Sequence, residues 1–582
     1  MIRNIFKSKK LYNINCNLFI VTTTNIIKHK KSFLSIKSFN FGVFNNRLEE
    51  NIDLKNLYDN TKFKFDESND INYNIYAFVH KIRKKGKAYF VILRSESITC
   101  QAVYFNNSEN SKSNNITNSL DLLTNESYIN LKAKLVKVNK PISYASIKNY
   151  ELDITEIKIV SLCKSVLPFQ MEDACRFSDI IKENDELNNK NNKKFNKTHT
   201  KVNLDTRLDN RVLDLRVPSN FSLIKLRSKI ISYFRDFLID RDFIEINTPK
   251  ISSTASEGGT AVFNLDFFGN KAYLSQSPQL YKQMSIIAGF NKVFEIGPVF
   301  RAENSNTGRH LCEFSMLDIE LDLKESNLTY YNSDYNKYIS TNFNYLNNNL
   351  EDANLNRNKA KVFYLIYLVN ELLVYILNNV KDNCSQLLDT INNHYSFNYP
   401  IYQKNTKYNS NIPLILGYKE AVELINNYIK NNSIQTDIQL ISEDLTTINE
   451  KILGNIVKEK YNLDLFFVYG YPLDKRPFYT KSSNYILENN VLSSDSFDCF
   501  LRGEEILSGS RRINNLSELI KSLDKHQIRK SSLEYYLEAF NLGVPEHGGV
   551  GIGLERLVKL IVNYSNVKKC SMFPRDPRRI IP

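Results

Sequence analysis

The sequence predicts an α+β protein in which a small N-terminal β-barrel precedes a larger domain of antiparallel strands flanked by helices. Two observations carry this prediction. Five short β-rich runs lie between residues 71 and 162, and apolar residues keep helical spacing from Leu223 to Leu238 before a strand-like segment. The length of 582 residues allows three or four domains of about 150 residues each. We therefore expect separate barrel and helix-sheet domains.

The N-terminal segment differs in charge from the rest of the chain. Its first 48 residues hold nine lysines or arginines and no acidic residue, so the net charge of +14 falls to +5 beyond them. Total charge is therefore a weak argument for nucleic-acid binding. We expect residues 1–70 to be a basic extension. Its composition is typical of an organellar transit peptide, and the alternative is a disordered basic extension that helps to hold RNA.

Cysteine spacing and hydropathy argue against metal-bound, disulfide-linked and membrane-spanning classes of protein. The eight cysteines are scattered without a CxxC pair, so neither a zinc ribbon nor a disulfide framework is indicated, and we expect reduced thiols. The most apolar run, Val362 to Val369, stops at Asn370 and Glu371. It is too short to span a bilayer, and we expect a buried helix and no membrane partner.

Three asparagine-rich stretches interrupt the chain, and they predict loop insertions because such polar tracts bury little apolar surface. They lie around Asn106–Asn118, Glu183–Lys197 and Asn327–Asn358, the last with 11 asparagines. The second falls in a predicted hinge or linker over residues 166–220.

The β-rich runs predict a barrel of oligonucleotide-binding (OB) type over residues 71–165, because five short strands near 100 residues are typical of that fold. The runs are IYAFVHKI, AYFVILR, ITCQAVYF, INLKAKLVKV and YELDITEIKIVSL. An unrelated small β-domain would have a similar pattern. Such barrels read single-stranded RNA by stacking bases on aromatic rings and by hydrogen bonds to base edges.

Beyond the linker, a helix and a strand are expected in sequence. Leu223, Leu226, Ile230, Ile231, Phe234, Phe237 and Leu238 keep helical spacing. Residues Phe243 to Ile251 then alternate like a strand, and Pro249 fits an edge position because it lacks a hydrogen-bond donor.

Two segments carry the strongest chemical signal. Residues 297–320 read GPVFRAENSNTGRHLCEFSMLDIE, which places several cationic side chains on a predicted strand-loop-strand suited to an oligophosphate. Residues 549–561 read GVGIGLERLVKLI, with Arg556 on a helix just after glycines that let the backbone approach a ligand. Each pattern alone is common, and their joint order is specific.

Together these segments resemble motifs 2 and 3 of class II aminoacyl-tRNA synthetases, and the helix-strand unit ending at Pro249 resembles motif 1, the homodimer interface of that family. The resemblance covers nearly all of residues 71–582 outside the insertions and is closest to the aspartyl enzymes of archaeal and eukaryotic type. It implies a class II catalytic domain over residues 221–582, built on an antiparallel sheet flanked by helices, with an Asn-rich insertion near 326–358. KGKAYFVILR and TCQAVYF are similar to the family's anticodon-binding barrel.

The resemblance assigns residues to each substrate. For ATP it implies Arg301, Glu303, Arg309, His310, Phe314, Glu505, Ser508 and Arg556, with Arg301 and Arg556 as catalytic residues and Glu505 and Ser508 as ligands of Mg²⁺. For L-aspartate it implies Glu257, Gln279, Lys282, Asp318 and Arg512. For the anticodon it implies Phe90, Gln101 and Glu151.

The aspartate assignment also has a physical basis. Gln279 and Lys282 are three apart, so on a helix both face one pocket. A carboxylate in a dry pocket needs cations, and Arg512 can bind it bidentately while Lys282 adds a point charge. Two departures from the family's pattern are notable: Gly308 replaces a common histidine, and Arg511 and Asn514 flank Arg512, where an added cation would change the field of the pocket.

The expected function is activation of L-aspartate with ATP and transfer to the 3′-hydroxyl of tRNA(Asp), by a homodimer. The alternative is a non-discriminating aspartyl or an asparaginyl enzyme. A catalytically dead RNA-binding paralogue is disfavoured because Arg301, Glu505, Arg512 and Arg556 are all present. An ammonia-dependent asparagine synthetase is disfavoured because that family lacks the anticodon barrel. A cytoplasmic-type enzyme imported into a plastid or mitochondrion is expected from the N-terminus, and a cytoplasmic location is the alternative.

Overall fold

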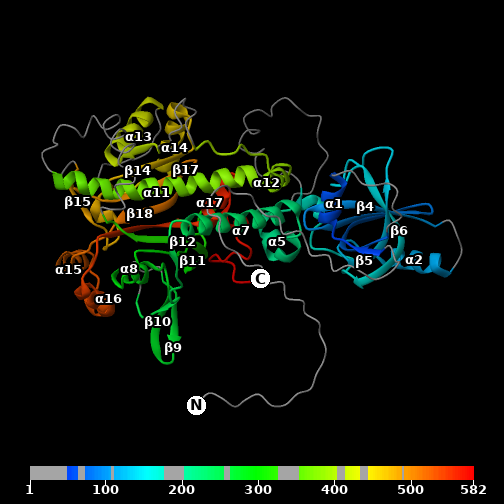
Figure 1. Cartoon of the computed structure of the whole chain (residues 1–582), viewed down its shortest axis with the longest axis horizontal. Helices are drawn as coiled ribbons and strands as arrows, with labels where there is room; N and C mark the ends of the chain where they lie inside the picture. Colours follow the sequence, from blue (N-terminus) through cyan, green and yellow to red (C-terminus); the bar gives the residue numbers. More distant parts are fainter. Residues whose placement is uncertain are drawn as a thin grey trace, which may run out of the picture. The chain divides into compact units, whose positions relative to one another are not determined.

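The N-terminal folded part is a closed β-barrel in the computed structural model, which describes residues 49–62, 72–106, 111–175, 202–254, 262–324, 353–402, 413–432, 443–487 and 490–582. Its five strands follow the order β2-β3-β4-β6-β5, and pairing of β2 with β5 closes the ring. The strands are β2 (Asn72–Lys85), β3 (Ala88–Ser95), β4 (Ile98–Phe105), β5 (Tyr128–Lys137) and β6 (Tyr150–Ser161). All five β-rich runs are therefore confirmed as strands (Figure 1).

The barrel also contains two helices and a short strand that the sequence analysis did not predict. Helix α2 (Ser111–Leu122) overlaps the first asparagine-rich stretch, so the expectation of a plain loop there was wrong. Ile116, Leu120 and Leu123 keep helical spacing and join the barrel core. Strand β1 (Glu49–Asn51) pairs with β2, and helix α1 (Leu54–Lys62) buries Leu54 and Leu57 in the same core. Residues 49–62, expected in the extension, thus contribute to the barrel.

The C-terminal part is built on an eight-stranded, mainly antiparallel sheet of order β13-β14-β17-β18-β19-β12-β11-β7. Its strands are β7 (Ile244–Glu245), β11 (Lys292–Phe300), β12 (Glu313–Asp322), β13 (Ile415–Gly417), β14 (Leu465–Tyr469), β17 (Ser496–Leu501), β18 (Glu504–Arg511) and β19 (His547–Gly553). Smaller sheets are formed by β8 (Ile251–Ser252), β9 (Asn264–Phe267) and β10 (Asn270–Leu274), and by β15 (Ser482–Ile486) and β16 (Leu492–Ser494).

Helices flank this sheet, as the sequence predicts. The longer ones are α7 (Pro218–Ile239), α8 (Gln279–Ile287), α11 (Ala353–Asn383), α12 (Ser385–Asn392), α13 (Tyr418–Asn432), α14 (Thr447–Tyr461), α15 (Leu516–Lys525) and α17 (Leu554–Ile561). Short helices are α3 (Met171–Ala174), α5 (Leu204–Asp209), α6 (Arg211–Asp214) and α16 (Glu534–Ala539), with 3₁₀ turns at η3 (Leu473–Lys475), η5 (Lys530–Leu533), η6 (Phe540–Leu542) and η7 (Val567–Cys570).

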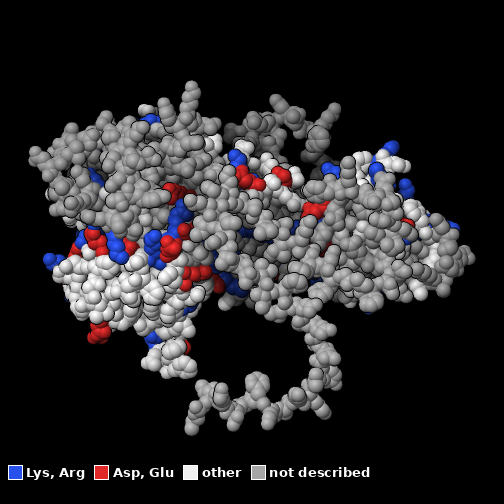
Figure 2. All heavy atoms as spheres, in the orientation of Figure 1, with Lys and Arg blue, Asp and Glu red and all other residues white. Residues whose placement is uncertain are grey.

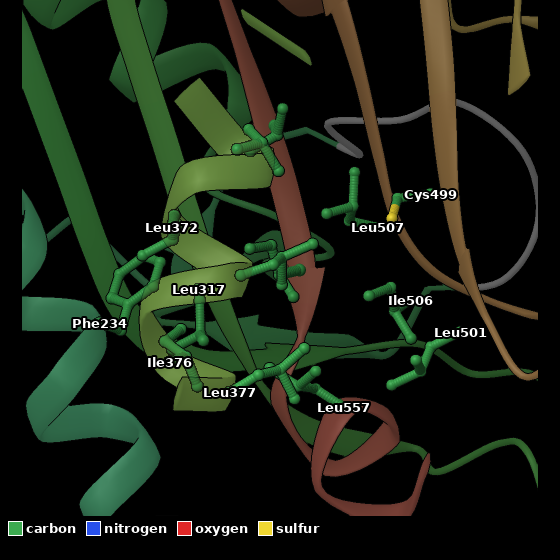
Figure 3. Packing of buried hydrophobic residues seen from close by; sticks show 14 of the residues in the cluster. Phe234, Leu317, Leu372, Ile376, Leu377, Cys499, Leu501, Ile506, Leu507 and Leu557 are labelled. Atoms are coloured by element: carbon green, nitrogen blue, oxygen red, sulfur yellow. The ribbon is translucent and has the colours of Figure 1, made fainter. Parts of the chain in front are cut away.

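The main core lies where α7, α11 and α17 pack on the sheet. Phe234 of α7 and Leu372, Ile376 and Leu377 of α11 meet Leu317 of β12 in this cluster (Figure 3). Six of the seven predicted apolar positions of α7 are buried, and the seventh, Ile231, is partly buried, because their spacing puts them on one face. The helical prediction for this segment is confirmed.

Helix α11 runs much further than its apolar run suggests. It continues through Asn370 and Glu371 to Asn383, and Asn370 is 3% exposed. The segment Lys359–Asn383 is long and apolar enough to cross a membrane by length and composition, and 78% of its most apolar window is buried inside the protein. The expectation of a buried helix is confirmed, whereas the expectation that no run has membrane-spanning length was wrong. The helix also begins at Ala353, inside the third asparagine-rich stretch.

The strand expected over Phe243 to Ile251 is largely absent. Ile244 and Glu245 pair with β11, the Ile246 backbone nitrogen donates to the Phe294 oxygen at 2.8 Å, and residues 247–250 belong to no strand before β8. Glu295 of β11 accepts hydrogen bonds from the backbone and hydroxyl of Thr248 and pairs with Lys250, so side chains rather than a ladder hold the segment around Pro249. The second asparagine-rich stretch and residues 1–48 lie outside the described residues.

Charges on the visible face of the described part are mixed. Acidic and basic side chains alternate along a band in Figure 2. This agrees with the nearly balanced composition beyond residue 48.

Candidate active site

A cavity of about 270 Å³ lies between helix α8 and the strands β12, β18 and β19. It is lined by twelve residues that the sequence assigns to ATP or aspartate: Gln279, Lys282, Arg301, Glu303, Arg309, His310, Phe314, Asp318, Glu505, Ser508, Arg512 and Arg556. Glu257 lies outside the described residues. The fold therefore gathers side chains from four separate parts of the sequence around one space.

The cationic loop between β11 and β12 forms one wall. The two strands pair in antiparallel register from Lys292 and Leu321 to Phe300 and Glu313, which confirms the strand-loop-strand prediction. The Arg301 guanidinium lies 5.5 Å from the centre of the Phe314 ring. Burial lowers the pKa of His310, and the nearby Arg556 acts in the same direction against Glu303. A neutral imidazole can accept or donate a hydrogen bond at a phosphate.

Strand β18 brings Glu505 and Ser508 to the same cavity through a β-bulge. Cys499 pairs with Leu507 and Phe500 with Glu505, so Ile506 is an extra residue in the ladder. Residues three apart on a regular strand face opposite ways, and the bulge resets this alternation. Ser508, Ser510 and Arg512 then follow at intervals of two and line the cavity together.

The electrostatics around Glu505 are unusual. Burial and the neighbouring Asp498 raise the pKa of Glu505 to about 7. The backbone oxygen of Glu505 accepts a hydrogen bond from Arg556 Nη1 at 2.8 Å. Asp498 itself is paired bidentately with Arg476, at 2.7 and 3.0 Å. A carboxylate with a raised pKa is stabilised in its charged form by an added cation.

At the other end of the cavity, Arg512 and Lys282 are neutralised by a residue that the sequence argument missed. Glu320 is fully buried and receives Arg512 Nε at 2.9 Å and Nη2 at 3.1 Å, and Lys282 Nζ lies 3.2 Å from it. Burial alone would raise the pKa of Glu320, but Arg512 and Lys282 hold it below the usual range. Lys282 also donates to Asp318 at 3.0 Å. Glu320 stands two residues after Asp318 in MLDIE, and this strand spacing was the available signal.

Arg511 does not act as an added cation of the pocket. It is absent from the cavity lining and binds Asp495 through Nε and Nη2, at 2.9 and 2.6 Å. Successive residues on β18 face opposite sides of the sheet, so Arg511 points away from the side where Arg512 lies. The expectation that Arg511 changes the pocket's field directly was wrong.

The glycines of β19 make room for carboxylates of the protein itself. A Cβ on Gly549 would lie 2.2 Å from Glu320 Oε2 and 2.1 Å from the Ile319 backbone oxygen. A Cβ on Gly551 would lie 3.2 Å from Asp318 Oδ1. Arg556 follows on α17, as predicted.

On the barrel, the three predicted anticodon residues lie on neighbouring strands. Gln101 Nε2 donates to Glu151 Oε2 at 2.7 Å, and Tyr144 Oη donates to Gln101 Oε1 at 2.5 Å. Phe90 is half-buried with its ring 6.5 Å from that of Phe105. Tyr144 and Phe105 were not singled out from the sequence.

Comparison with known proteins agrees with this arrangement. Residues 203–577 match the family of tRNA synthetases class II (D, K and N). The chain is 37% identical over 506 residues to the cytoplasmic aspartate–tRNA ligase of Mus musculus and 36% identical over 507 residues to that of Homo sapiens, covering 87% of each chain in both cases. It also resembles the solved aspartyl-tRNA synthetase of Entamoeba histolytica, with a TM-score of 0.69, 34% identity, and coverage of 88% and 90%. Asparaginyl-tRNA synthetase from Pyrococcus horikoshii, at 22% identity and a TM-score of 0.65, shares the fold.

The sheet, the cavity and these matches define a class II aminoacyl-tRNA synthetase. Within that class, the chain belongs to the family of aspartate–tRNA ligases of eukaryotic type, to which it is similar over most of its length.

Proposed function

We propose that the chain activates L-aspartate with ATP and transfers it to the 3′-hydroxyl of tRNA(Asp). Two cations, Arg512 and Lys282, lie in one buried pocket, and this observation carries the choice of amino acid, because a carboxylate side chain needs cations there. The buried amide nitrogen of Gln279 has no hydrogen-bond partner among the described residues, so it offers a further donor. Asp318 supplies an acceptor for the substrate ammonium, together with Glu257.

The other end of the cavity is proposed to bind ATP. Arg301 stabilises the α-phosphate, Arg556, Arg309 and His310 hold the terminal phosphates, and Glu303 binds the adenine edge. Phe314 and Arg556 stack on the two faces of the base. The cavity brings all six side chains together, which supports this assignment.

Magnesium is proposed to bind at Glu505 and Ser508. The described residues contain no group of three or more His, Cys, Asp or Glu side chains arranged to hold a metal ion. Mg²⁺ usually binds through one or two protein oxygens together with substrate phosphates, so a carboxylate and a hydroxyl fit it. The Glu505 carboxylate, which is half-buried and lines the cavity, has the chemistry of such a ligand. When bound, the ion neutralises charge on the phosphate oxygens.

The reaction has two steps. An oxygen of the aspartate α-carboxylate attacks the α-phosphorus, the bond to the β-phosphate oxygen breaks, and pyrophosphate leaves with the bonding electrons. Charge spreads over the phosphoryl oxygens, where Arg301 is placed to stabilise it, so this step depends on positioning and electrostatics. The 3′-hydroxyl of tRNA then attacks the adenylate carbonyl, AMP leaves, and the hydroxyl proton passes out with the products.

The barrel is proposed to bind the anticodon through Phe90, Gln101 and Glu151. A homodimer through the motif 1 region is also proposed. For location, the relatives named above are cytoplasmic enzymes, which supports the cytoplasmic alternative; import into a plastid or mitochondrion stays a prediction that rests on the acid-free N-terminus.

The test is amino-acid-dependent exchange of pyrophosphate into ATP, followed by aminoacylation of purified tRNA(Asp) and tRNA(Asn). We expect exchange with aspartate and little with asparagine. A preference for asparagine would contradict the proposal in favour of an asparaginyl enzyme, and charging of both tRNAs with aspartate would indicate a non-discriminating one.

A further inference from the structure

Helix α14 places a buried carboxylate against the phosphate end of the cavity. Glu450, in its first turn, is 5% exposed, and Oε2 of its side chain accepts two hydrogen bonds. One comes from Arg309 Nη2 at 2.7 Å, and the other comes from the backbone nitrogen of Glu505 at 3.1 Å. A single oxygen therefore joins the cationic loop to the strand that carries the proposed metal ligand.

The same helix binds the second amino group of Arg309. Arg309 Nη1 donates to Thr447 Oγ1 at 2.7 Å, three residues before Glu450 on α14. Arg309 Nε lies 3.8 Å from Glu504, beyond hydrogen-bond distance, and is a buried donor without a hydrogen-bond partner among the described residues. Helix α14 thus binds both terminal nitrogens of the Arg309 guanidinium, and Nε is the nitrogen that it does not bind.

Backbone packing fixes where α14 lies. Gly454 and Gly503 meet so closely that a Cβ on Gly454 would come within 2.4 Å of Gly503 Cα. Gly503 has φ +69°, a conformation that favours glycine, in the turn between β17 and β18. The contact presses the helix against the start of β18, so Glu450 reaches both of its partners.

We propose that Glu450 is a positioning residue for ATP: with Thr447 it pre-orients Arg309 and ties it to the Glu505 segment. This inference rests on the proposed function. A buried carboxylate with one cationic partner costs desolvation energy, so a contact of this kind stabilises the fold less than an apolar pair would. The main effect of the contact is therefore to orient the Arg309 side chain and not to stabilise the fold.

The experiment compares Glu450→Gln with Glu459→Gln, an exposed glutamate on the same helix. The glutamine can still accept from the Glu505 nitrogen but loses the charge-assisted bond to Arg309. Aspartate-dependent pyrophosphate exchange should show a KM for ATP raised about tenfold, the effect of losing one charge-assisted hydrogen bond. The KM for aspartate and the unfolding temperature should match the control.

Three results would overturn the proposal. They are an ATP KM within twofold of the unmodified chain, a lowered ATP KM, or a parallel rise of both KM values with a lower unfolding temperature. Should Glu450→Gln fail to fold, Thr447→Val at an exposed position removes the other bond and must raise the ATP KM alone. Absence of exchange in the unmodified chain would instead contradict the proposed function, and this inference with it.

Discussion

Arg512 is already paired with a carboxylate of the protein itself, before any substrate binds. Its fork is already bound to Glu320, and Lys282 is shared between Glu320 and Asp318. The side chains of the pocket therefore include two cations and two carboxylates, and their summed charge is close to neutral. A substrate carboxylate must share these cations, and the fork geometry of arginine makes such sharing possible because it has five donors.

Replacing Arg512 by lysine tests this arrangement at the level of one side chain. Arg512→Lys keeps the charge and loses the fork, so the KM for aspartate should rise about tenfold or more while the KM for ATP changes little. Arg529→Lys, at an exposed position, is the matched control. Arg512→Leu should also lower stability, because it leaves Glu320 short of a partner, at a cost of about 3 to 5 kcal/mol. Normal aspartate kinetics in the lysine variant would remove Arg512 from the substrate pocket.

Arg301 is expected to act on the transition state. Arg301→Ala should cut aspartate-dependent exchange by about 10² or more, the usual effect of removing one preorganised charge stabiliser. The measurement is kcat for exchange, with circular dichroism to verify folding. Near-normal exchange by a folded variant would show that the α-phosphate does not depend on this guanidinium.

The glycines of strand β19 leave space for the Glu320 carboxylate because they have no side chain. Gly549 faces the Ile319 backbone and the Glu320 carboxylate, so Gly549→Ala should destabilise the protein by about 1 to 3 kcal/mol and displace Glu320. Urea unfolding and aspartate KM measure the two effects. Gly417→Ala is the control, because a Cβ there would have no neighbour within 4 Å among the described residues. Equal stability of the two variants would argue against the close contact.

The barrel offers a separate test, because its proposed RNA contacts are distinct from the ATP cavity. Gln101→Ala breaks the bonds to Glu151 and Tyr144 and should weaken aminoacylation of tRNA(Asp) while leaving pyrophosphate exchange intact. Glu156→Gln, on the exposed side of β6, serves as control. Equal losses in both assays would point to misfolding of the barrel instead.

The whole chain exposes apolar residues near the predicted dimer interface. Ile239, Ile244 and Ile251 lie at the ends of α7, β7 and β8, and each is about half exposed. We expect the chain to sediment at twice its own mass, and Ile244→Asp to shift it toward the monomer, since a buried unpaired charge opposes association. Leu542→Asp, at another exposed apolar position, should sediment as the unmodified chain does. A monomeric unmodified chain would contradict the dimer proposal.

Local patterns predicted much of this molecule because they depend on neighbours in sequence. The period of α7 follows from apolar spacing, and the five barrel strands follow from β-rich runs. Gln279 and Lys282 were expected to share a face if their segment is helical, and α8 meets that condition. Composition was a poorer guide. Asparagine-rich segments predicted loops where α2 and the start of α11 are helical, since a few correctly spaced apolar residues suffice to anchor a helix.

Contacts between distant segments could not be predicted in this way. The bulge at Ile506 turns Glu505 and Ser508 to one side, and it depends on pairing with β17. The partnership of Arg512 with Glu320 joins positions 192 residues apart, and Glu450 reaches Arg309 because Gly454 packs on Gly503. The sequence determined which residue types are available and which local elements they form. The register of the sheet and the packing of helices on it determined which of those residues meet, because hydrogen bonds and ion pairs depend on distances that only the folded chain sets.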